Sequence, residues 1–154
     1  MIKYIVMDVD GTLTDGKIYL GQNGEICKVF DVKDGYGIRN IAPKAGLIPV
    51  IITGRNSDIV ANRCHELEVK EVYQGVIDKT EILCSITSEL KSVAFIGDDI
   101  NDLACMKMVK EAGGKIGCPA NAVSAIKEIA DFISVYNGGN GAVRDFIEWT
   151  LTLR

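Results

Sequence analysis

The sequence is poor in a residue type on which several common active sites depend. Histidine occurs once, at position 65, in a chain of 154 residues. One imidazole excludes a multi-histidine metal site and any Ser-His-Asp arrangement that needs two or more of them. We expect His65 itself on the surface of a helix.

Cysteine is present but shows no pattern of a disulfide framework or a redox pair. The five cysteines include no C-x-x-C pair, and their number is odd. Such usage is typical of reduced thiols in a reducing compartment. We therefore expect the cysteines mostly to fill the core of a cytoplasmic protein.

Long apolar runs and an excess of positive charge are also missing. No stretch approaches the roughly 20 apolar residues of a membrane-spanning helix, and the start, MIKYIVMDVD, lacks the features of a signal peptide. The net charge is −4, and the 17 lysines and arginines are scattered. These features argue against a membrane or a nucleic acid as partner. Any phosphate must be bound by a local cluster of residues.

The hydrophobic content is 47%, enough for the core of one domain, and we predict a single domain over residues 1–154. Short β-branched segments alternate with segments of helical period. This alternation predicts an α/β fold with a parallel sheet. The expected strands are KYIVMD, IPVIIT, EVYQ, SVAFIGD, GKIG and DFISV.

Five segments carry a single apolar stripe at helical spacing. They cover residues 38–45, 59–67, 82–90, 123–130 and 143–151. Pro43 lies inside the first of them. Because a proline in a helix interior costs about 3 kcal/mol, we expect that helix to be kinked or shortened.

The interval from residue 17 to residue 31 breaks the alternation. In KIYLGQNGEICKVFD, a Gly/Asn-rich turn from Gly21 to Gly24 separates two short alternating runs. This pattern predicts a β-hairpin. A hairpin that projects from a parallel sheet has exposed edges, so we expect another part of the protein or another copy of the chain to cover it.

Polar clusters follow three of the predicted strands. DVDGT (8–12) follows the first strand, TGR (53–55) follows IPVII, and GDDIND (97–102) follows SVAFI. In an open α/β sheet the ligand crevice lies beyond the carboxyl ends of the strands. We therefore expect the three clusters to meet in that crevice.

Their chemistry favours metal-assisted phosphoryl transfer. Asp8 and Asp98 can converge as oxygen ligands for Mg²⁺, which keeps them ionised and draws in a phosphate oxygen. Strand alternation places Asp8 and Asp10 on one side, so that Asp8 can attack phosphorus while Asp10 protonates the leaving alkoxide and later activates water. Thr53 adds a hydroxyl donor, and Lys79, which opens a predicted helix, adds a positive charge.

Each cluster by itself also has a purely structural explanation. Asp-Gly pairs are common in turns and at helix N-caps, and GDD could simply cap a helix. Thr53 could be a turn residue, and Lys79 could be a solvated charge. The four elements together, each at a strand exit or a helix start and each of the right chemical type, favour the functional interpretation.

In combination, DVDGTLTD, IITGR, Lys79 and GDDIND resemble the four motifs of the haloacid dehalogenase superfamily of phosphatases. The resemblance implies Mg²⁺ as cofactor, with Asp8 as nucleophile and metal ligand. It also implies Asp10 as an acid/base that offers its backbone carbonyl to the metal, and Asp98 as the remaining ligand. The phosphate-binding positions would be Thr53, Gly54 and Lys79, and the positions that support the ligands would be Asp99 and Asp102.

Over nearly the whole chain the sequence is similar to the capless 3-deoxy-D-manno-octulosonate 8-phosphate phosphatases. The similarity runs through YLGQNGEICKVFDVKDGYGIR, TGR, NRC, YQG, DK, GDD and GGNGAVRDF. It implies a three-layer, Rossmann-like parallel sheet with a projecting hairpin and no cap domain. It further implies a homotetramer whose hairpins join and whose neighbouring subunits close the active site. Substrate contacts are then expected from Asp31, Lys33, Asp34, Gly35, Arg39, Arg55 and Arg63.

The resemblance thus implies hydrolysis of 3-deoxy-D-manno-octulosonate 8-phosphate to the free sugar acid and phosphate, through an aspartyl phosphate. Two alternatives stay open. One is a phosphatase for a nine-carbon, sialic-acid-type ulosonate 9-phosphate, and the other is a catalytically silent oligomerisation domain. A scaffold has no physical need for converging charges, which argues against the silent domain. Departures from the family pattern, at Thr12, at Pro43 and in a chain that stops at Arg154, bear on the substrate more than on the chemistry.

Overall fold

The computed structural model describes residues 1–153 and contains one six-stranded parallel sheet. The strands lie in the order β5-β4-β1-β6-β7-β8. Every predicted strand is present, and the α/β fold is confirmed. The bounds are Tyr4–Met7 for β1, Ile48–Ile52 for β4, Glu71–Tyr73 for β5, Val93–Ile96 for β6, Lys115–Cys118 for β7 and Phe132–Ile133 for β8.

The strand β1 lies in the middle of the sheet, between β4 and β6. Val6 is in register with Val50 on one side and with Phe95 on the other. The chain leaves β1 toward β4 and β5 and then returns to β6 on the opposite side, so the strand order reverses at β1. Ligands of open α/β sheets bind at such a switch point, outside the carboxyl ends of the strands.

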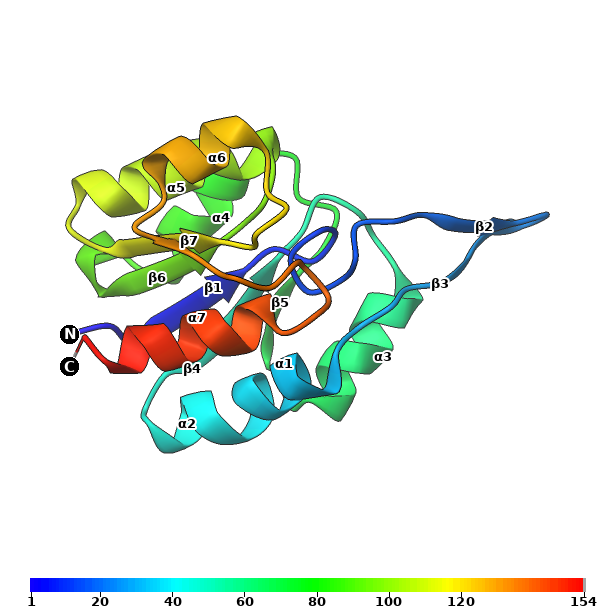
Figure 1. Cartoon of the computed structure of the whole chain (residues 1–154), viewed down its shortest axis with the longest axis horizontal. Helices are drawn as coiled ribbons and strands as arrows, with labels where there is room; N and C mark the ends of the chain where they lie inside the picture. Colours follow the sequence, from blue (N-terminus) through cyan, green and yellow to red (C-terminus); the bar gives the residue numbers. More distant parts are fainter. Residues whose placement is uncertain (154) are drawn as a thin grey trace.

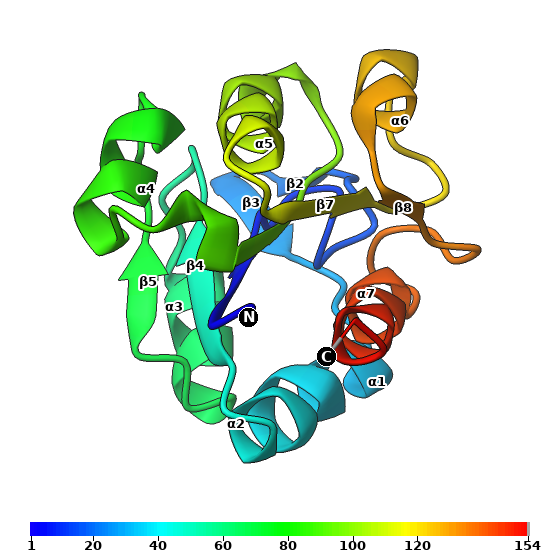
Figure 2. The same cartoon turned by 90° about the vertical axis from the view of Figure 1, so that its left-hand side faces the viewer.

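Helices cover both faces of the sheet, which gives the predicted three layers (Figure 2). Successive residues of β1 face opposite sides: Ile5 and Met7 pack in one apolar cluster and Val6 in the other. The first face is covered by α1 (Val32–Tyr36), α2 (Ala42–Lys44), α3 (Asp58–Glu66) and α7 (Ala142–Leu151). The second face is covered by α4 (Lys79–Ile86), α5 (Ile100–Glu111) and α6 (Ser124–Ile129).

The helical segment that contains Pro43 is interrupted, as expected. A π-helical turn, η1 (Gly37–Ile41), separates α1 from α2. The amide of Ala42 donates to the carbonyl of Gly37, five residues earlier. This wider turn directly precedes Pro43, which lies in the first turn of α2.

Apolar spacing did not predict α1 or α5, and α5 is the longest helix of the described residues. Asp99 is its N-cap and forms a capping box with Asp102. Its buried face consists of Asp102, Cys105, Met106 and Val109. An acidic residue thus occupies the first buried position of this face and breaks the apolar stripe.

The predicted hairpin is present and projects beyond the carboxyl edge of the sheet (Figure 1). It consists of β2 (Tyr19–Gly21) and β3 (Gly24–Cys27), which pair antiparallel, and a bridge from Thr14 to Phe30 closes its base. The hairpin exposes apolar side chains and buries a charged one. The apolar residues Leu20 and Ile26 are 70% and 67% exposed, whereas the side chain of Lys28 is 1% exposed.

Two smaller expectations can be compared with the structure. His65 lies exposed on α3, as predicted. All five cysteines are free, but only Cys64, Cys105 and Cys118 are buried, so the expectation that the cysteines fill the core holds for three of them.

Within residues 1–153, no helix has the length and apolar character needed to cross a bilayer.

Candidate active site

Asp8 is the first residue after β1 and is almost fully buried. It is 3% exposed, and its amide donates to the carbonyl of Ile96 on β6 at 3.1 Å. The chain then turns sharply, and the carbonyl of Val9 accepts hydrogen bonds from the amides of Thr12, Leu13 and Thr14. Gly11 adopts a φ of +92°, and a Cβ atom at this position would collide with the carboxylate of Asp98. The turn therefore requires glycine.

The loop of residues 137–141 supports this turn from the side. The amide of Gly139 donates to the carbonyl of Thr12 at 3.2 Å, and that of Gly138 donates to Oδ1 of Asn121 at 3.0 Å. A Cβ atom at Gly138 would collide with the carbonyl of Gly11. The glycines of the late GGNG motif thus allow a second loop to pack directly against the turn that follows Asp8.

Lys79 opens α4, as predicted, and its ammonium lies between two carboxylates. Nζ is 2.6 Å from Oδ1 of Asp8 and 2.7 Å from Oδ1 of Asp102. Burial by itself would lower the pKa of Lys79, but the two carboxylates outweigh burial and raise that pKa above its ordinary value. Lys79 is therefore a fixed positive charge beneath Asp8.

A third carboxylate, that of Asp98, lies beside the two that Lys79 binds. Oxygen atoms of Asp8, Asp98 and Asp102 lie within 4.8 Å of one another. Burial, together with the charge of Asp102, raises the pKa of Asp8 well above its usual range and raises the pKa of Asp98 to about 6. When all three carboxylates are ionised, the cluster carries more negative charge than Lys79 balances, and a divalent cation would restore the balance. Hard oxygen donors at this spacing fit Mg²⁺.

The three carboxylates differ in what their oxygens already bind. Asp102 accepts from Lys79 on Oδ1, and its Oδ2 accepts from the amides of Asp98 and Asp99 at 3.1 and 3.4 Å. Asp8 and Asp98 line the open crevice, and Asp102 does not. Asp8 and Asp98 are therefore placed to hold a metal, while Asp102 orients the lysine and the loop behind it.

A crevice of about 450 Å³ opens at the carboxyl edge of the sheet. Thr53, the first residue after β4, is 2% exposed, and its amide donates to the carbonyl of Tyr73. Thr12 donates its hydroxyl to Oδ1 of Asp98 at 3.0 Å and so links the first and third polar clusters. The structure brings together the three clusters that the sequence placed at strand exits. The crevice is lined by Asp8, Asp10, Gly16, Thr53, Gly54, Arg55, Asp98, Asp99, Ile100 and Asn101.

Of the seven predicted substrate-binding residues, Arg55 alone lines this crevice. Asp31 caps α1 through the amides of Lys33 and Asp34. Asp34 is 1% exposed and accepts hydrogen bonds from the amides of Gly141 and Arg144, at the start of α7. Within one chain, Asp31 therefore caps α1, and Asp34 links α1 to the start of α7.

The remaining three predicted residues also have partners away from the crevice. Arg39 pairs with Glu68 at 2.6 Å. Arg63 binds Glu66 at 2.8 Å and lies over the ring of Phe30. Gly35 lies against Arg63, whose guanidinium a Cβ at position 35 would contact. Contacts of these residues with a substrate, including contacts across subunits, stay a prediction.

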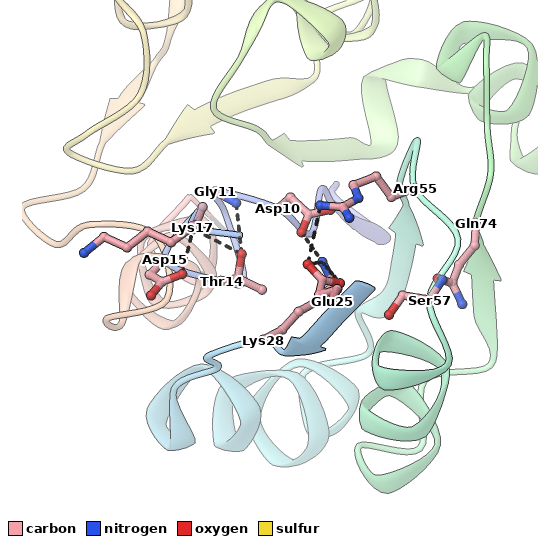
Figure 3. Close-up of polar contacts among 11 residues, drawn as sticks. Asp10, Gly11, Thr14, Asp15, Lys17, Glu25, Lys28, Arg55, Ser57 and Gln74 are labelled. Carbon is pink, nitrogen blue, oxygen red and sulfur yellow. Dashed lines mark hydrogen bonds and ion pairs between the residues drawn. The ribbon is translucent and has the colours of Figure 1, made fainter. Parts of the chain in front are cut away.

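Two site residues that the sequence did not suggest come from the hairpin (Figure 3). Nζ of Lys28 is 2.5 Å from Oδ1 of Asp10 and 3.1 Å from Glu25. Glu25 in turn lies 3.4 Å from Nη1 of Arg55. Alternation along the hairpin shows that its two faces differ but not which face turns inward, so no sequence signal distinguished Lys28 from a solvated lysine.

The chain is similar to known proteins over almost its full length. No family model matches the chain. The Escherichia coli K12 protein KdsC, a 3-deoxy-D-manno-octulosonate 8-phosphate phosphatase, is 38% identical over 154 residues, which cover 97% of this chain and 79% of that protein. Its counterpart in Yersinia pestis is 36% identical, and the match covers 97% of this chain and 80% of that protein.

Solved structures agree over almost the full length. The 3-deoxy-D-manno-octulosonate 8-phosphate phosphatase from Moraxella catarrhalis, crystallised with magnesium, phosphate and KDO, has a TM-score of 0.90 and 37% identity, and the match covers 99% of this chain and 87% of that one. The cobalt-bound form of the Haemophilus influenzae enzyme has a TM-score of 0.88 and 32% identity, and the match covers 98% of this chain and 88% of that one. With this identity, this coverage and this arrangement of carboxylates, the chain belongs to the 3-deoxy-D-manno-octulosonate 8-phosphate phosphatase family of the haloacid dehalogenase superfamily.

Proposed function

We propose that this chain is a Mg²⁺-dependent phosphatase that hydrolyses 3-deoxy-D-manno-octulosonate 8-phosphate to the sugar acid and inorganic phosphate. The observation that carries the proposal is the convergence of Asp8, Asp98 and Lys79 at the switch point of the sheet. The identity of the substrate is inferred from the family to which the chain belongs. Asp8, Asp98 and the backbone carbonyl of Asp10 would hold Mg²⁺, which would supply positive charge to a phosphate oxygen.

In the first half of the reaction, a carboxylate oxygen of Asp8 attacks phosphorus. The new Asp8–phosphorus bond forms as the bond from phosphorus to the sugar oxygen breaks, and Asp10 gives its proton to that leaving oxygen. Lys79 and Thr53 bind the phosphate and neutralise part of its charge. The product of this step is the free sugar acid together with an aspartyl phosphate.

In the second half, water attacks the phosphorus of the aspartyl phosphate. Asp10, now a carboxylate, accepts a proton from that water, and the bond between phosphorus and Asp8 breaks. Inorganic phosphate leaves, and both carboxyl groups return to their starting states. The position of Asp10 two residues beyond the nucleophile, on a turn that lines the crevice, supports this double role.

Arg55 supports a substrate with hydroxyl or carboxylate groups beyond its phosphate. It follows Thr53 and Gly54 directly, lines the crevice and keeps its side chain 47% exposed. A guanidinium can bind a carboxylate with two parallel hydrogen bonds. Arg55 therefore lies where the part of a ulosonic acid phosphate beyond the phosphate would lie.

The test is release of inorganic phosphate from a panel of sugar phosphates with Mg²⁺ present. The panel contains the eight-carbon ulosonate 8-phosphate, a nine-carbon ulosonate 9-phosphate and simple hexose phosphates, and the Asp8→Asn variant is the control. We expect the highest kcat/KM with the eight-carbon compound and no turnover after chelation with EDTA. Preference for the nine-carbon compound would change the substrate, and inactivity toward the whole panel would support a silent domain.

We further propose that the chain forms a homotetramer through its hairpins. A two-stranded ribbon is marginally stable in water, and this one exposes Leu20 and Ile26, with Val32 79% exposed beyond its base. Packing of copies against one another would bury these side chains and cover the free strand edges. Sedimentation velocity should give the mass of four chains, and a monomer at micromolar concentration would contradict the proposal.

We also propose that the enzyme acts in the cytoplasm. The support is its cysteine chemistry, since all five thiols are free and two of them, Cys27 and Cys84, are exposed. Exposed free thiols are typical of a reducing compartment. Fractionation of the cells that produce the protein, followed by immunoblotting, should place it with cytoplasmic markers, and recovery in a secreted fraction would contradict this placement.

A further inference from the structure

Lys28 occupies an unusual place for a lysine on a projecting hairpin. Its side chain is 1% exposed, although the apolar residues Leu20 and Ile26 of the same hairpin are 70% and 67% exposed. Its ammonium contacts two carboxylates, those of Asp10 and Glu25. Lysines are almost never fully buried unless they are paired, so this arrangement specifies one position for the side chain.

The two reactive carboxylates of the proposed mechanism are thus each held by a lysine of their own. Lys79, at the start of α4, binds Asp8. Lys28, on the hairpin, binds Asp10. Asp8 is buried and fixed by its surroundings, but the side chain of Asp10 is 24% exposed on the crevice wall. Of the two, Asp10 has more need of a partner to fix its direction.

We infer that Lys28 is a positioning residue for the proposed reaction: its ammonium fixes the direction of the Asp10 carboxylate, and Glu25 fixes the ammonium. The inference rests on the proposed phosphatase function, because only there does the direction of Asp10 matter. A group that transfers a proton must lie within hydrogen-bond reach of the leaving oxygen, and a displacement of about 1 Å can cost about 100-fold in rate.

The ion pairs that begin at Asp10 and Lys28 continue through Glu25 to Arg55, the residue expected to contact the substrate. Glu25 contacts Lys28 at 3.1 Å and Arg55 at 3.4 Å. One carboxylate on β3 thus links the proton-transferring Asp10 with the arginine beyond the phosphate site. Movement of the hairpin would displace both of these groups together.

The experiment compares Lys28→Met and Lys28→Arg with Lys17→Met, a control at an exposed lysine of the same hairpin. Two substrates are used: an alkyl phosphate, whose leaving oxygen needs a proton, and p-nitrophenyl phosphate, whose leaving group does not. For Lys28→Met we expect kcat on the alkyl phosphate to fall about 100-fold with KM nearly unchanged, the lower end of the range for general acid catalysis. The first step with p-nitrophenyl phosphate, followed by stopped flow, should stay within about threefold of wild type.

Two further variants separate positioning from a structural role. Lys28→Arg keeps the charge, and we expect it to recover kcat on the alkyl phosphate to within about tenfold of wild type. In an Asp10→Asn background, Lys28→Met should cost less than about threefold more, because residues that act as one unit are not additive. Lys28→Arg also keeps the question answerable if the methionine variant does not fold.

Three results would overturn the inference. Equal losses on both substrates would indicate a general structural role, a rise in KM without a change in kcat would make Lys28 a substrate contact, and full additivity with Asp10→Asn would make the two residues independent. Failure of the proposed function is distinguishable. A wild-type chain that hydrolyses other alkyl phosphates but no ulosonate phosphate loses its proposed substrate while the comparison above still applies. A chain with no phosphatase activity overturns both.

Discussion

The carboxyl edge of the sheet and the hairpin that projects beyond it differ in which side chains they bury and which they expose. At the edge, Asp8 and Lys79 are 3% and 4% exposed and are paired with each other. On the hairpin, Leu20 and Ile26 are 70% and 67% exposed. The edge thus places its charges inside the protein, and the hairpin places its apolar side chains outside. The groups for phosphoryl transfer are assembled within one chain, whereas the surface above them is left incomplete.

The physical reason lies in the number of layers around each region. The edge is bounded by helices on both faces, so its polar groups are desolvated and must find partners in the protein. The hairpin has two strands and no helix of its own, so at least one face meets water. Lys28 is the exception, because it carries a buried charge from the hairpin into the edge. Four predictions test this contrast.

The largest effect is expected from Asp8→Asn at the edge. The amide cannot form an aspartyl phosphate, and we expect turnover to fall on the order of 10⁵-fold, as for the removal of other nucleophiles. The fold should persist, because the amide keeps the size of the carboxyl group. Phosphate release with Mg²⁺ measures the loss, and circular dichroism checks the fold. Appreciable Mg²⁺-dependent turnover would show that Asp8 is not the nucleophile.

Lys79→Met tests whether the charges of the edge depend on each other. It removes the ammonium that lies between Asp8 and Asp102, and breaking such a buried pair costs about 3–5 kcal/mol. Urea denaturation at pH 7.5 should show this loss, while Lys70→Met, at an exposed lysine, should change stability by less than about 0.5 kcal/mol. A destabilisation below about 1 kcal/mol would mean that the carboxylates are less confined than the structure indicates.

Asp34 gives a third test, because it is a buried carboxylate outside the crevice. Burial raises its pKa from 3.8 to about 6. Between these values the unfolded chain loses the proton and the folded chain keeps it, so the free energy of unfolding falls as the pH rises, by about 3 kcal/mol in total. Asp34→Asn should remove this decline between pH 4 and pH 6. The contributions of the other carboxylates cancel when the unfolding free energies of the wild type and the variant are subtracted at each pH. Parallel curves of unfolding free energy against pH for the two proteins would contradict the prediction.

The smallest effect is expected from a single exposed residue of the hairpin. Leu20→Ser removes an apolar side chain that the proposed tetramer would bury, and we expect association to weaken by about 2 kcal/mol, or roughly 30-fold. Sedimentation velocity over a concentration series measures the shift. Ile77→Ser, at a fully exposed residue outside the hairpin, is the matched control. Equal behaviour of the two variants would place the interface elsewhere.

Much of the edge was predictable because it depends on local order along the chain. A polar residue that directly follows a buried strand must emerge at the carboxyl edge, whatever the surrounding packing. Asp8, Thr53 and Asp98 therefore meet in the structure as their positions indicated. The periodicity that predicted most helices failed for α5, because Asp102 occupies a buried position of that helix, where it pairs with Lys79.

The hairpin could be located from the sequence but its orientation could not. Alternation and the Gly21–Gly24 turn determined that two strands pair over residues 17–31, and strand order determined where Asp8 and Asp98 emerge. Whether Lys28 points into the crevice or into water depends on which face of the ribbon meets the sheet edge. That choice is made by contacts between residues far apart in the chain, Lys28 with Asp10 and Glu25 with Arg55, so only the tertiary structure decided it.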